Sequence, residues 1–419
     1  MLETLRTAWK IKDLRQKIIF TISMLFVFRL GSFIPIPGVD PTAFEDLFQE
    51  DNLFGLMNVI TGDALSRFSI FAMGIFPYIN ASIIMNLLTI VIPKLEQLAK
   101  EGEEGRKKLA QFTRYGTVLL ALIQATGMTF TPFIQQAVIT RGGFANFTII
   151  ISLTAGTAFL MWLGEQITDR GIGNGISLII FAGIIAGFPS AAAILIETVR
   201  VGEASIILAV IVVLILLGLL VGIVGLEEGQ RRIPVQYAKR IVGRRMYGGQ
   251  STHIPLKVNQ AGVIPVIFAS AILTLPATVA QFIDQPIINR IGDALTFGRP
   301  LNTVLYFLLI FFFTFFYTAI QFDPMKVSGD MKKYGGFIPG LRPGRPTAEY
   351  LARVSSRLTF AGALALASIA VMPILFQNAT RVNMMFSGTG LIIIVGVALE
   401  TMKQIETHML MRNYQGFMK

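Results

Sequence analysis

The apolar residues of this 419-residue chain fall into long hydrophobic runs that are separated by polar segments. Each run approaches the roughly 20 residues that a helix needs to cross a bilayer. The pattern therefore predicts an all-α polytopic membrane protein. Ten transmembrane helices are expected, at residues 18–36, 71–92, 115–134, 147–168, 175–198, 206–225, 258–281, 303–322, 356–376 and 386–404.

Ten spans divide into an N-terminal half, residues 18–198, and a C-terminal half, residues 199–404. Each half crosses the membrane an odd number of times, so the second half enters in the opposite orientation. If the halves are related, the fold is an inverted repeat with its site or pathway between the halves.

The region 53–92 departs from a simple span. It is too long for one crossing and too short for two, and Thr61, Gly62, Asp63 and Arg67 interrupt it. We interpret it as a short helix that enters from outside and stops, followed by a full span. Irregular backbone at membrane depth is tolerated only inside protein or along an aqueous cavity. The alternative is an amphipathic helix on the outer leaflet.

Two long loops, residues 226–257 and 323–355, alternate basic and apolar residues. A disordered linker would avoid their Ile, Val, Tyr and Phe, so ordered projecting fingers are favoured over loops that only hold topology. Basic projections suit a large acidic partner, either protein or RNA.

Positive charge is distributed unevenly. Of the 36 Lys and Arg residues, 29 lie in alternate inter-span segments, six lie in the opposite loops and Arg29 lies inside the first span. Basic loops remain in the cytoplasm, so both termini are predicted inside. Hydrophobic content of 53% with 15% charged residues also favours a membrane protein.

The remaining terminal segments are short. Residues 1–17 are basic and weakly amphipathic through Leu2, Leu5 and Trp9, which predicts an interfacial helix on the inner leaflet. No cleavage site follows the first span, so this segment is not a cleavable signal. Residues 405–419 are predicted to form a cytoplasmic tail.

Residues that could do chemistry are scarce. The chain has no Cys and two distant His residues, which excludes disulfides and argues against a metal cluster. Residues 171–175, GIGNG, follow a predicted membrane helix rather than a strand, so they are interpreted as a turn and not a nucleotide fingerprint. No enzyme activity and no cofactor are expected.

Several residues within the predicted spans indicate their own surroundings but do not identify a function. Arg29 is expected to snorkel or to pair with another helix. Ile75 and Ile79 share a helix face, as do Ile176 and Ile180, and on the residues alone lipid-facing or core positions are favoured for them. Polar side chains in the spans indicate helix contacts or a lining that separates. These are Asn80, Asn86, Gln124 and Asn259.

Seven stretches resemble the SecY family, the channel subunits of the bacterial protein translocase. They include RLGSFIPIPGVD (29–40), GDALSRFSIFAMGIFPYINASIIMNLL (62–88), EGEEGRKKLAQFTRYGT (101–117), FLMWLGEQITDRGIGNGISLIIFAGI (159–184), GQRRIPVQYAKR (229–240), QSTHIPLKVNQAGVIPVIFASAI (250–272) and GGFIPGLRPGRPTAEYL (335–351). They follow one another in order over nearly the whole chain.

The resemblance implies a clam-shell channel made of two inverted five-helix halves. It implies a pore ring of apolar side chains, which can grip a polypeptide while making ion passage costly. By position in the matching motifs, the ring consists of Ile75, Ile79, Ile176, Ile180, Ile267 and Ile393. A re-entrant plug helix is implied at about 55–68, with Leu56, Asn58, Ile60, Asp63, Leu65 and Arg67.

A lateral gate is implied between spans 2 and 3 and spans 7 and 8, near Asn80, Gln124 and Asn259. The two long loops would dock the motor ATPase SecA or the ribosome with its nascent chain, through Arg342 and also Arg240, Arg244 and Arg245. Further implied partners are SecE, SecG, the secretory polypeptide with its signal sequence, and membrane lipid. The implied location is the bacterial plasma membrane.

Two other function classes fit parts of the pattern. A secondary transporter of a small solute would use the same inverted repeat, but it would need a buried acidic coupling residue, and the spans offer none at mid-membrane. A membrane anchor with basic recruiting loops would leave the cavity-facing segment unexplained.

Overall fold

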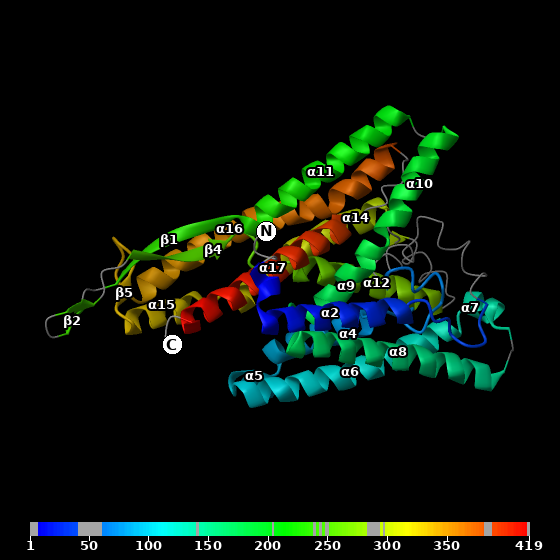
Figure 1. Cartoon of the computed structure of the whole chain (residues 1–419), viewed down its shortest axis with the longest axis horizontal. Helices are drawn as coiled ribbons and strands as arrows, with labels where there is room; N and C mark the ends of the chain where they lie inside the picture. The colour runs from blue at the N-terminus through cyan, green and yellow to red at the C-terminus, as the bar shows by residue number, and fades with distance from the viewer. Residues whose placement is uncertain are drawn as a thin grey trace.

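The computed structural model describes residues 7–40, 61–139, 142–202, 205–237, 240–242, 245–247, 251–282, 294–295, 298–380 and 388–416. Long helices run side by side in a bundle, and a small sheet projects from one end of it (Figure 1). The main helices are α2 (Lys12–Gly31), α4 (Phe76–Val91), α6 (Glu103–Thr129), α8 (Gly143–Arg170), α9 (Gly175–Ala186), α10 (Phe188–Val201), α11 (Ile206–Glu228), α12 (Ile264–Phe282), α14 (Pro300–Gln321), α16 (Arg345–Thr380) and α17 (Gly388–Gly416).

Every predicted span overlaps one or two of these helices. Within the described residues, six helical stretches are long and apolar enough to span a membrane, with α9 and α10 counted together and α14 counted with α15 (Pro324–Lys333). The number is seven if α4 and α5 (Pro93–Lys100), which are bent by 100°, count as one span. Helices α2 and α6 include charged residues in their first turns, which lowers their apolarity. The fold class is therefore that of a polytopic helical membrane protein.

Several helix boundaries differ from the prediction. Helix α2 begins at Lys12, so residues 12–17 are continuous with the helix of the first span, whereas residues 7–10 form a separate short helical piece. The span expected at 175–198 is two helices, because Gly187 ends α9 and Pro189 starts α10. The expected tail begins as helix, since α17 continues to Gly416.

The two long loops are not separate fingers. Strand β1 (Gln230–Tyr237) pairs with β4 (Ser251–Lys257) from the same loop and with β5 (Gly336–Phe337) from the other, in the order β4-β1-β5. Ile233, Val235, Leu256 and Ile338 are buried in one apolar cluster with residues of α15 (Pro324–Lys333) and the start of α16. We call this unit the sheet body.

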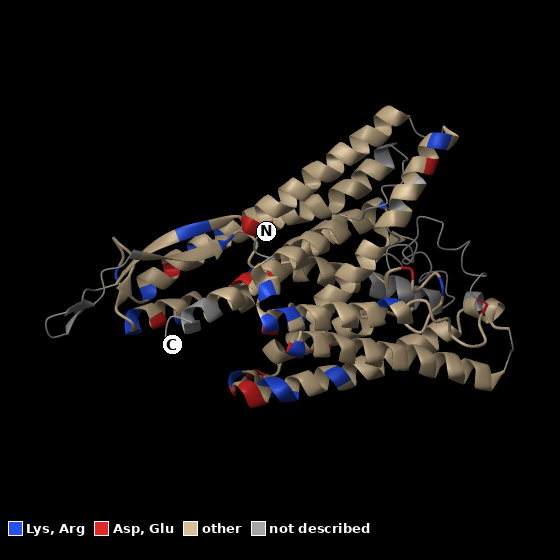
Figure 2. Ribbon diagram, viewed as in Figure 1, with Lys and Arg blue, Asp and Glu red and all other residues tan. Residues whose placement is uncertain are grey.

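The sheet body carries much of the charge. In Figure 2 most Lys and Arg residues gather at the end of the molecule that holds the sheet body and α5, and few interrupt the bundle. Helix α2 begins and α17 ends on this same side (Figure 1). The uneven distribution of Lys and Arg that the sequence predicts is therefore also present in the folded structure.

Among the described residues, the two halves, α2–α10 and α11–α17, contact each other through three main helix pairs, one of which is α10 with α11, consecutive in the chain. Helix α4 contacts α12, and α9 contacts α17. One apolar cluster extends across both halves and includes Ile79 on α4, Ile180 on α9 and Ile393 on α17.

Candidate functional site

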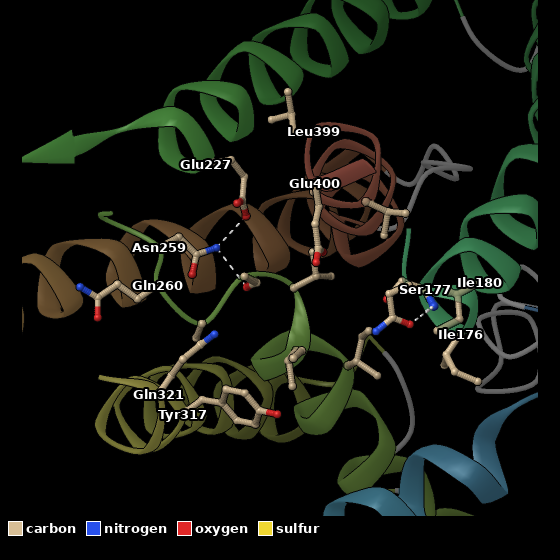
Figure 3. Close-up of a pocket in the computed structure, with 18 of the residues that line it drawn as sticks. Ile176, Ser177, Ile180, Glu227, Asn259, Gln260, Tyr317, Gln321, Leu399 and Glu400 are labelled. Atoms are coloured by element: carbon tan, nitrogen blue, oxygen red, sulfur yellow. Dashed lines mark hydrogen bonds between the residues drawn. The ribbon is translucent and has the colours of Figure 1, made fainter. Parts of the chain in front are cut away.

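A cavity of about 530 Å³ lies between the halves, and residues of both halves line it. Its wall toward the sheet body is polar and charged, with Glu227, Lys257, Asn259, Glu400 and Lys403. Isoleucines form another part of the wall: Ile79, Ile176, Ile180, Ile264 and Ile267. Figure 3 shows Ile176 and Ile180 on α9 across the cavity from Glu227 and Asn259.

Helix α9 shows how the wall is ordered along the bundle. Ile176 and Ile180 are one turn apart and both line the cavity, since residues four apart share a helix face. Gly183, roughly 4.5 Å further along the axis, no longer lines it; a Cβ built on Gly62 would lie 3.0 Å from the Gly183 Cα. The isoleucines therefore stand between the cavity and the segment that contains Gly62.

The other two residues of the predicted ring do not line the cavity. Ile75 precedes the first turn of α4 and is 3% exposed, and Ile393 on α17 is 1% exposed. Both belong to the same apolar cluster as the four ring isoleucines that line the cavity. The structure thus places all six residues in one apolar region between the halves, with four of them accessible from the cavity.

Residues 61–75, which we call the re-entrant segment after the prediction from the sequence, lead directly into α4. Of the described part of the predicted plug, Thr61 is helical and residues 62–68 form turns and bends. Gly62, Asp63 and Phe68 have positive φ angles, which break helical geometry. Leu56, Asn58 and Ile60 lie outside the described residues.

The re-entrant segment is held by packing and by backbone contacts. Leu65 and Phe68 are each 1% exposed within a cluster formed with α6, α7 (Pro132–Ala137) and α8. The Ile36 amide donates to the Phe68 carbonyl and the Ile70 amide donates to the Ile34 carbonyl. The proline-rich loop after α2 therefore supplies the hydrogen bonds that a strand or helix would otherwise provide.

Arg29 explains how a charge is accommodated in the first span. Its Nη1 donates to the carbonyl of Gly62, and its guanidinium stacks over the Phe33 ring at 4.7 Å. The guanidinium of Arg67 lies over the same Phe33 ring, at 4.3 Å. Arg29 thus bonds the re-entrant segment rather than another helix.

Glycine allows the re-entrant segment to approach α8. A Cβ on Gly156 would lie 1.8 Å from the Ile70 carbonyl oxygen. We expect Gly156→Ala to lower the free energy of unfolding by about 2 kcal/mol or more, because no flexible side chain can move aside. Gly218→Ala on α11, where a Cβ meets nothing within 4 Å, is the matched control. Equal thermal midpoints of the two variants in detergent would contradict this packing.

The three residues expected at the lateral gate lie on different elements and have different hydrogen-bond partners. Asn80 on α4 is buried, and its Oδ1 has no hydrogen-bond partner among the described residues. Gln124 is half-buried on α6, which contacts α4. Asn259 lies before α12 and its Nδ2 donates to Glu227 Oε1 at 2.7 Å and to the Gly262 carbonyl at 3.0 Å. Asn259 is therefore bonded within its own half.

Glu227 is a cavity residue that was missed from the sequence. It is the penultimate residue of α11, an otherwise apolar helix that ends in Glu227 and Glu228, and this paired acidic ending was the available signal. It lies at the helix end beside the sheet body and not at mid-membrane. A coupling carboxylate of a solute transporter would be expected near mid-membrane.

Arg342 lies on a loop that the rest of the sheet body holds in place. Its carbonyl accepts from Thr347 Oγ1 at 2.8 Å, and the Gly344 carbonyl accepts from Ser328 Oγ at 2.6 Å. Ile338 anchors the start of the loop at 4% exposure, while the Arg342 side chain is exposed. Arg240 and Arg245 lie in the hairpin of β2 (Arg240–Val242) and β3 (Arg245–Tyr247), and Arg244 lies outside the described residues.

Solved structures share this fold. One, described as "The structure of a protein conducting channel", superposes with a TM-score of 0.65 at 19% identity and covers 93% of this chain and 91% of that one. Another, of Sec61 in a canine ribosome–channel complex from the endoplasmic reticulum, gives a TM-score of 0.61 at 18% identity over the same shares. The fold is that of a multi-pass membrane channel.

Sequence comparison is more specific. The SecY family model matches residues 69–402. Protein translocase subunit SecY of Halalkalibacterium halodurans is 49% identical over 100% of both chains. Its counterpart in Escherichia coli K12 is 48% identical over 97% of this chain and 94% of that one. The chain belongs to the SecY family.

Proposed function

We propose that this chain is the protein-conducting channel subunit of a bacterial Sec translocase, through which unfolded secretory polypeptides cross the plasma membrane. The observation that carries the proposal is the cavity between the halves. It is polar toward the sheet body, and four isoleucines of the predicted ring line it next to the re-entrant segment. A polypeptide would enter from the sheet body, pass the isoleucines and displace the re-entrant segment.

The apolar collar suits this task physically. Apolar side chains contact an extended chain of any sequence without requiring particular hydrogen bonds, and a narrow apolar constriction dewets and so resists ions. The collar is Ile75, Ile79, Ile176, Ile180, Ile267 and Ile393, and the re-entrant segment with Asp63, Leu65 and Arg67 is the plug. The chain performs no chemistry itself, so a partner supplies the energy.

Apolar segments of the substrate would leave sideways between α4 with α6 and α12 with α14. Helices α4 and α12 contact each other through apolar surfaces, and lipid can replace such contacts at small cost because lipid tails are equally apolar. Asn80 and Gln124 lie on the N-terminal side of this gate. Asn259 precedes the gate helix α12.

The sheet body is the proposed docking unit for the SecA motor or for a ribosome with its nascent chain. One structural neighbour is a yeast Ssh1 complex bound to the 80S ribosome, at a TM-score of 0.63 and 16% identity. Exposed basic side chains suit both ribosomal RNA and an acidic motor surface. Arg342 is the first candidate contact, followed by Arg240, Arg244 and Arg245.

The remaining assignments follow from the family and the charge distribution. SecE and SecG are the expected neighbouring subunits. Both termini face the cytoplasm, since basic segments stay inside, with residues 18–198 as the N-terminal half and 199–404 as the C-terminal half.

Crosslinking to a stalled substrate tests the proposal. The chain has no native Cys, so every disulfide it forms must involve an introduced cysteine. Single cysteines are placed at Ile79, at Ile176 and at Leu214, which is 61% exposed on α11. A secretory chain with one cysteine is stalled midway across in membranes supplied with SecA and ATP, and is then oxidised. We expect disulfides at Ile79 and Ile176 but not at Leu214. Intact translocation without disulfides at the two ring positions would place the path elsewhere.

A further inference from the structure

The turn after α8, residues Gly171–Asn174, touches the opposite half of the molecule. The Gly173 amide donates to Gln404 Oε1 on α17 at 2.9 Å. Next to this bond, Ile172 and Ile405 are 4% and 5% exposed in one small cluster with Ala8 and Leu14. We call the turn together with Gln404 and Ile405 the joint.

Glycines allow this close approach. A Cβ on Gly171 would lie 2.4 Å from Thr21 Oγ1, and one on Gly175 would lie 1.9 Å from the Gly164 carbonyl oxygen. Gly173 has a φ of +90°, and a Cβ there would lie 2.9 Å from Leu178 and 3.2 Å from Thr401 Oγ1 on α17. The GIGNG sequence is therefore needed both for the turn and for its contact with α17.

The turn is also fixed within its own half. The Ile172 amide donates to Thr21 Oγ1 at 3.0 Å, and the Gly175 amide donates to Thr168 Oγ1 at 2.9 Å. Asn174 caps α9 by accepting from the Ser177 amide. The contact to α17 is thus made by a rigid element and not by a loop that could follow a moving helix.

The joint and the contact between α4 and α12 differ in what would replace them if the halves separated there. At the joint, Asp169 and Arg170 are exposed, so this end of the helices faces water. Separating Ile172 from Ile405 would expose apolar surface to water and leave the Gly173 amide without its acceptor, and both changes are unfavourable. If α4 and α12 separated, their apolar surfaces would contact lipid tails instead of water, and this costs less free energy.

We infer that the joint is a fixed pivot, with Gln404 as its positioning residue, and that the halves separate along α4 and α12 while they stay attached at the joint. This inference rests on the proposed function, because it describes how that channel opens. It assigns a role to the GIGNG turn, which the polypeptide path itself does not require.

Crosslinking the full chain in its translocase complex tests the pivot. One variant carries Ile172→Cys and Ile405→Cys at the joint; another carries Ser82→Cys and Ile264→Cys, which line the cavity from α4 and α12. A protease site between α10 and α11 reports the crosslinked fraction, because crosslinked halves stay together after cleavage. After oxidation, we expect the joint variant to translocate as fast as its reduced form and the α4–α12 variant to stop.

Loss of translocation on oxidation of the joint would overturn the pivot and leave the proposed function standing, because the reduced form still translocates. A reduced form that assembles but translocates nothing would count against the proposed function instead.

Gln404→Leu tests the same inference without cysteines. It removes the acceptor of the Gly173 amide, and we expect translocation to slow by about fivefold, the effect of one hydrogen bond. Gln404→Glu keeps an acceptor oxygen and is expected to match the parent. A merely structural role would change the amount of assembled complex rather than the rate per complex. Equal rates for the parent and Gln404→Leu would overturn the inference.

Discussion

Replacing Ile79 and Ile176 together by glycine is expected to make the resting channel leak ions. The two side chains line the cavity from α4 and α9, at the level where its wall becomes apolar. Removing them widens the constriction and lets water remain in it, so the barrier to ions falls. Each loss of about 1.4 kcal/mol from that barrier raises the conductance roughly tenfold. Ion flux through purified complexes in planar bilayers measures the change.

The same two helices provide the control. Ile84 on α4 and Ile185 on α9 are 44% and 42% exposed, so they face away from the cavity. The double variant Ile84→Gly with Ile185→Gly carries the same helix-propensity cost of about 1 kcal/mol per glycine. Equal leakage from both double variants would mean that glycine loosens the helices in general and that the isoleucine collar is not the seal.

Reversing the charge of Arg342 is expected to uncouple the channel from its partner. The loop is anchored by Ile338 and by the carbonyl bonds to Ser328 and Thr347, so Arg342→Glu should leave its backbone in place. A like charge facing an acidic partner costs several kcal/mol. We expect translocation driven by SecA and ATP to fall by at least about tenfold, with resting conductance unchanged.

Lys326→Glu makes the same charge change elsewhere on the sheet body, at an exposed position of α15. It should reduce partner binding much less. If both variants lose the same activity, the partner responds to net charge and not to the Arg342 loop. If Arg342→Glu also raises the resting conductance, the loop acts on the seal as well as on docking.

The helices themselves could be predicted because a bilayer imposes a local rule. A run of about 20 apolar residues is required wherever a helix crosses, and no distant residue changes that requirement. The break at Thr61-Gly62-Asp63 was predicted from these residues. The break between α9 and α10 was missed, although Gly187 and Pro189 are an equally local signal. The full lengths of α6, α16 and α17 were not predicted, because these helices continue past the apolar runs into charged segments, where hydropathy does not indicate a helix.

The candidate site could not be found in this way. Ile79 and Ile84 are five residues apart on α4, yet one lines the cavity and the other is exposed on the outside. Apolar side chains are suitable for both places, so residue type does not separate a collar from a lipid-facing surface. The family resemblance named the collar, and the packing of α4 against α12 and of α9 against α17 gives it a physical location.

The sequence by itself determined the membrane class, the approximate spans and the side that carries positive charge. Only the tertiary structure decided that Tyr237 pairs with Gly336, that Arg29 bonds Gly62 and that Gln404 accepts from Gly173. The membrane class, the spans and the charged side depend on the free energy of transferring each short segment from water to lipid, and this free energy is set by the residues of that segment alone. The three contacts depend on backbone groups far apart in the chain, which find partners only when whole helices pack against each other.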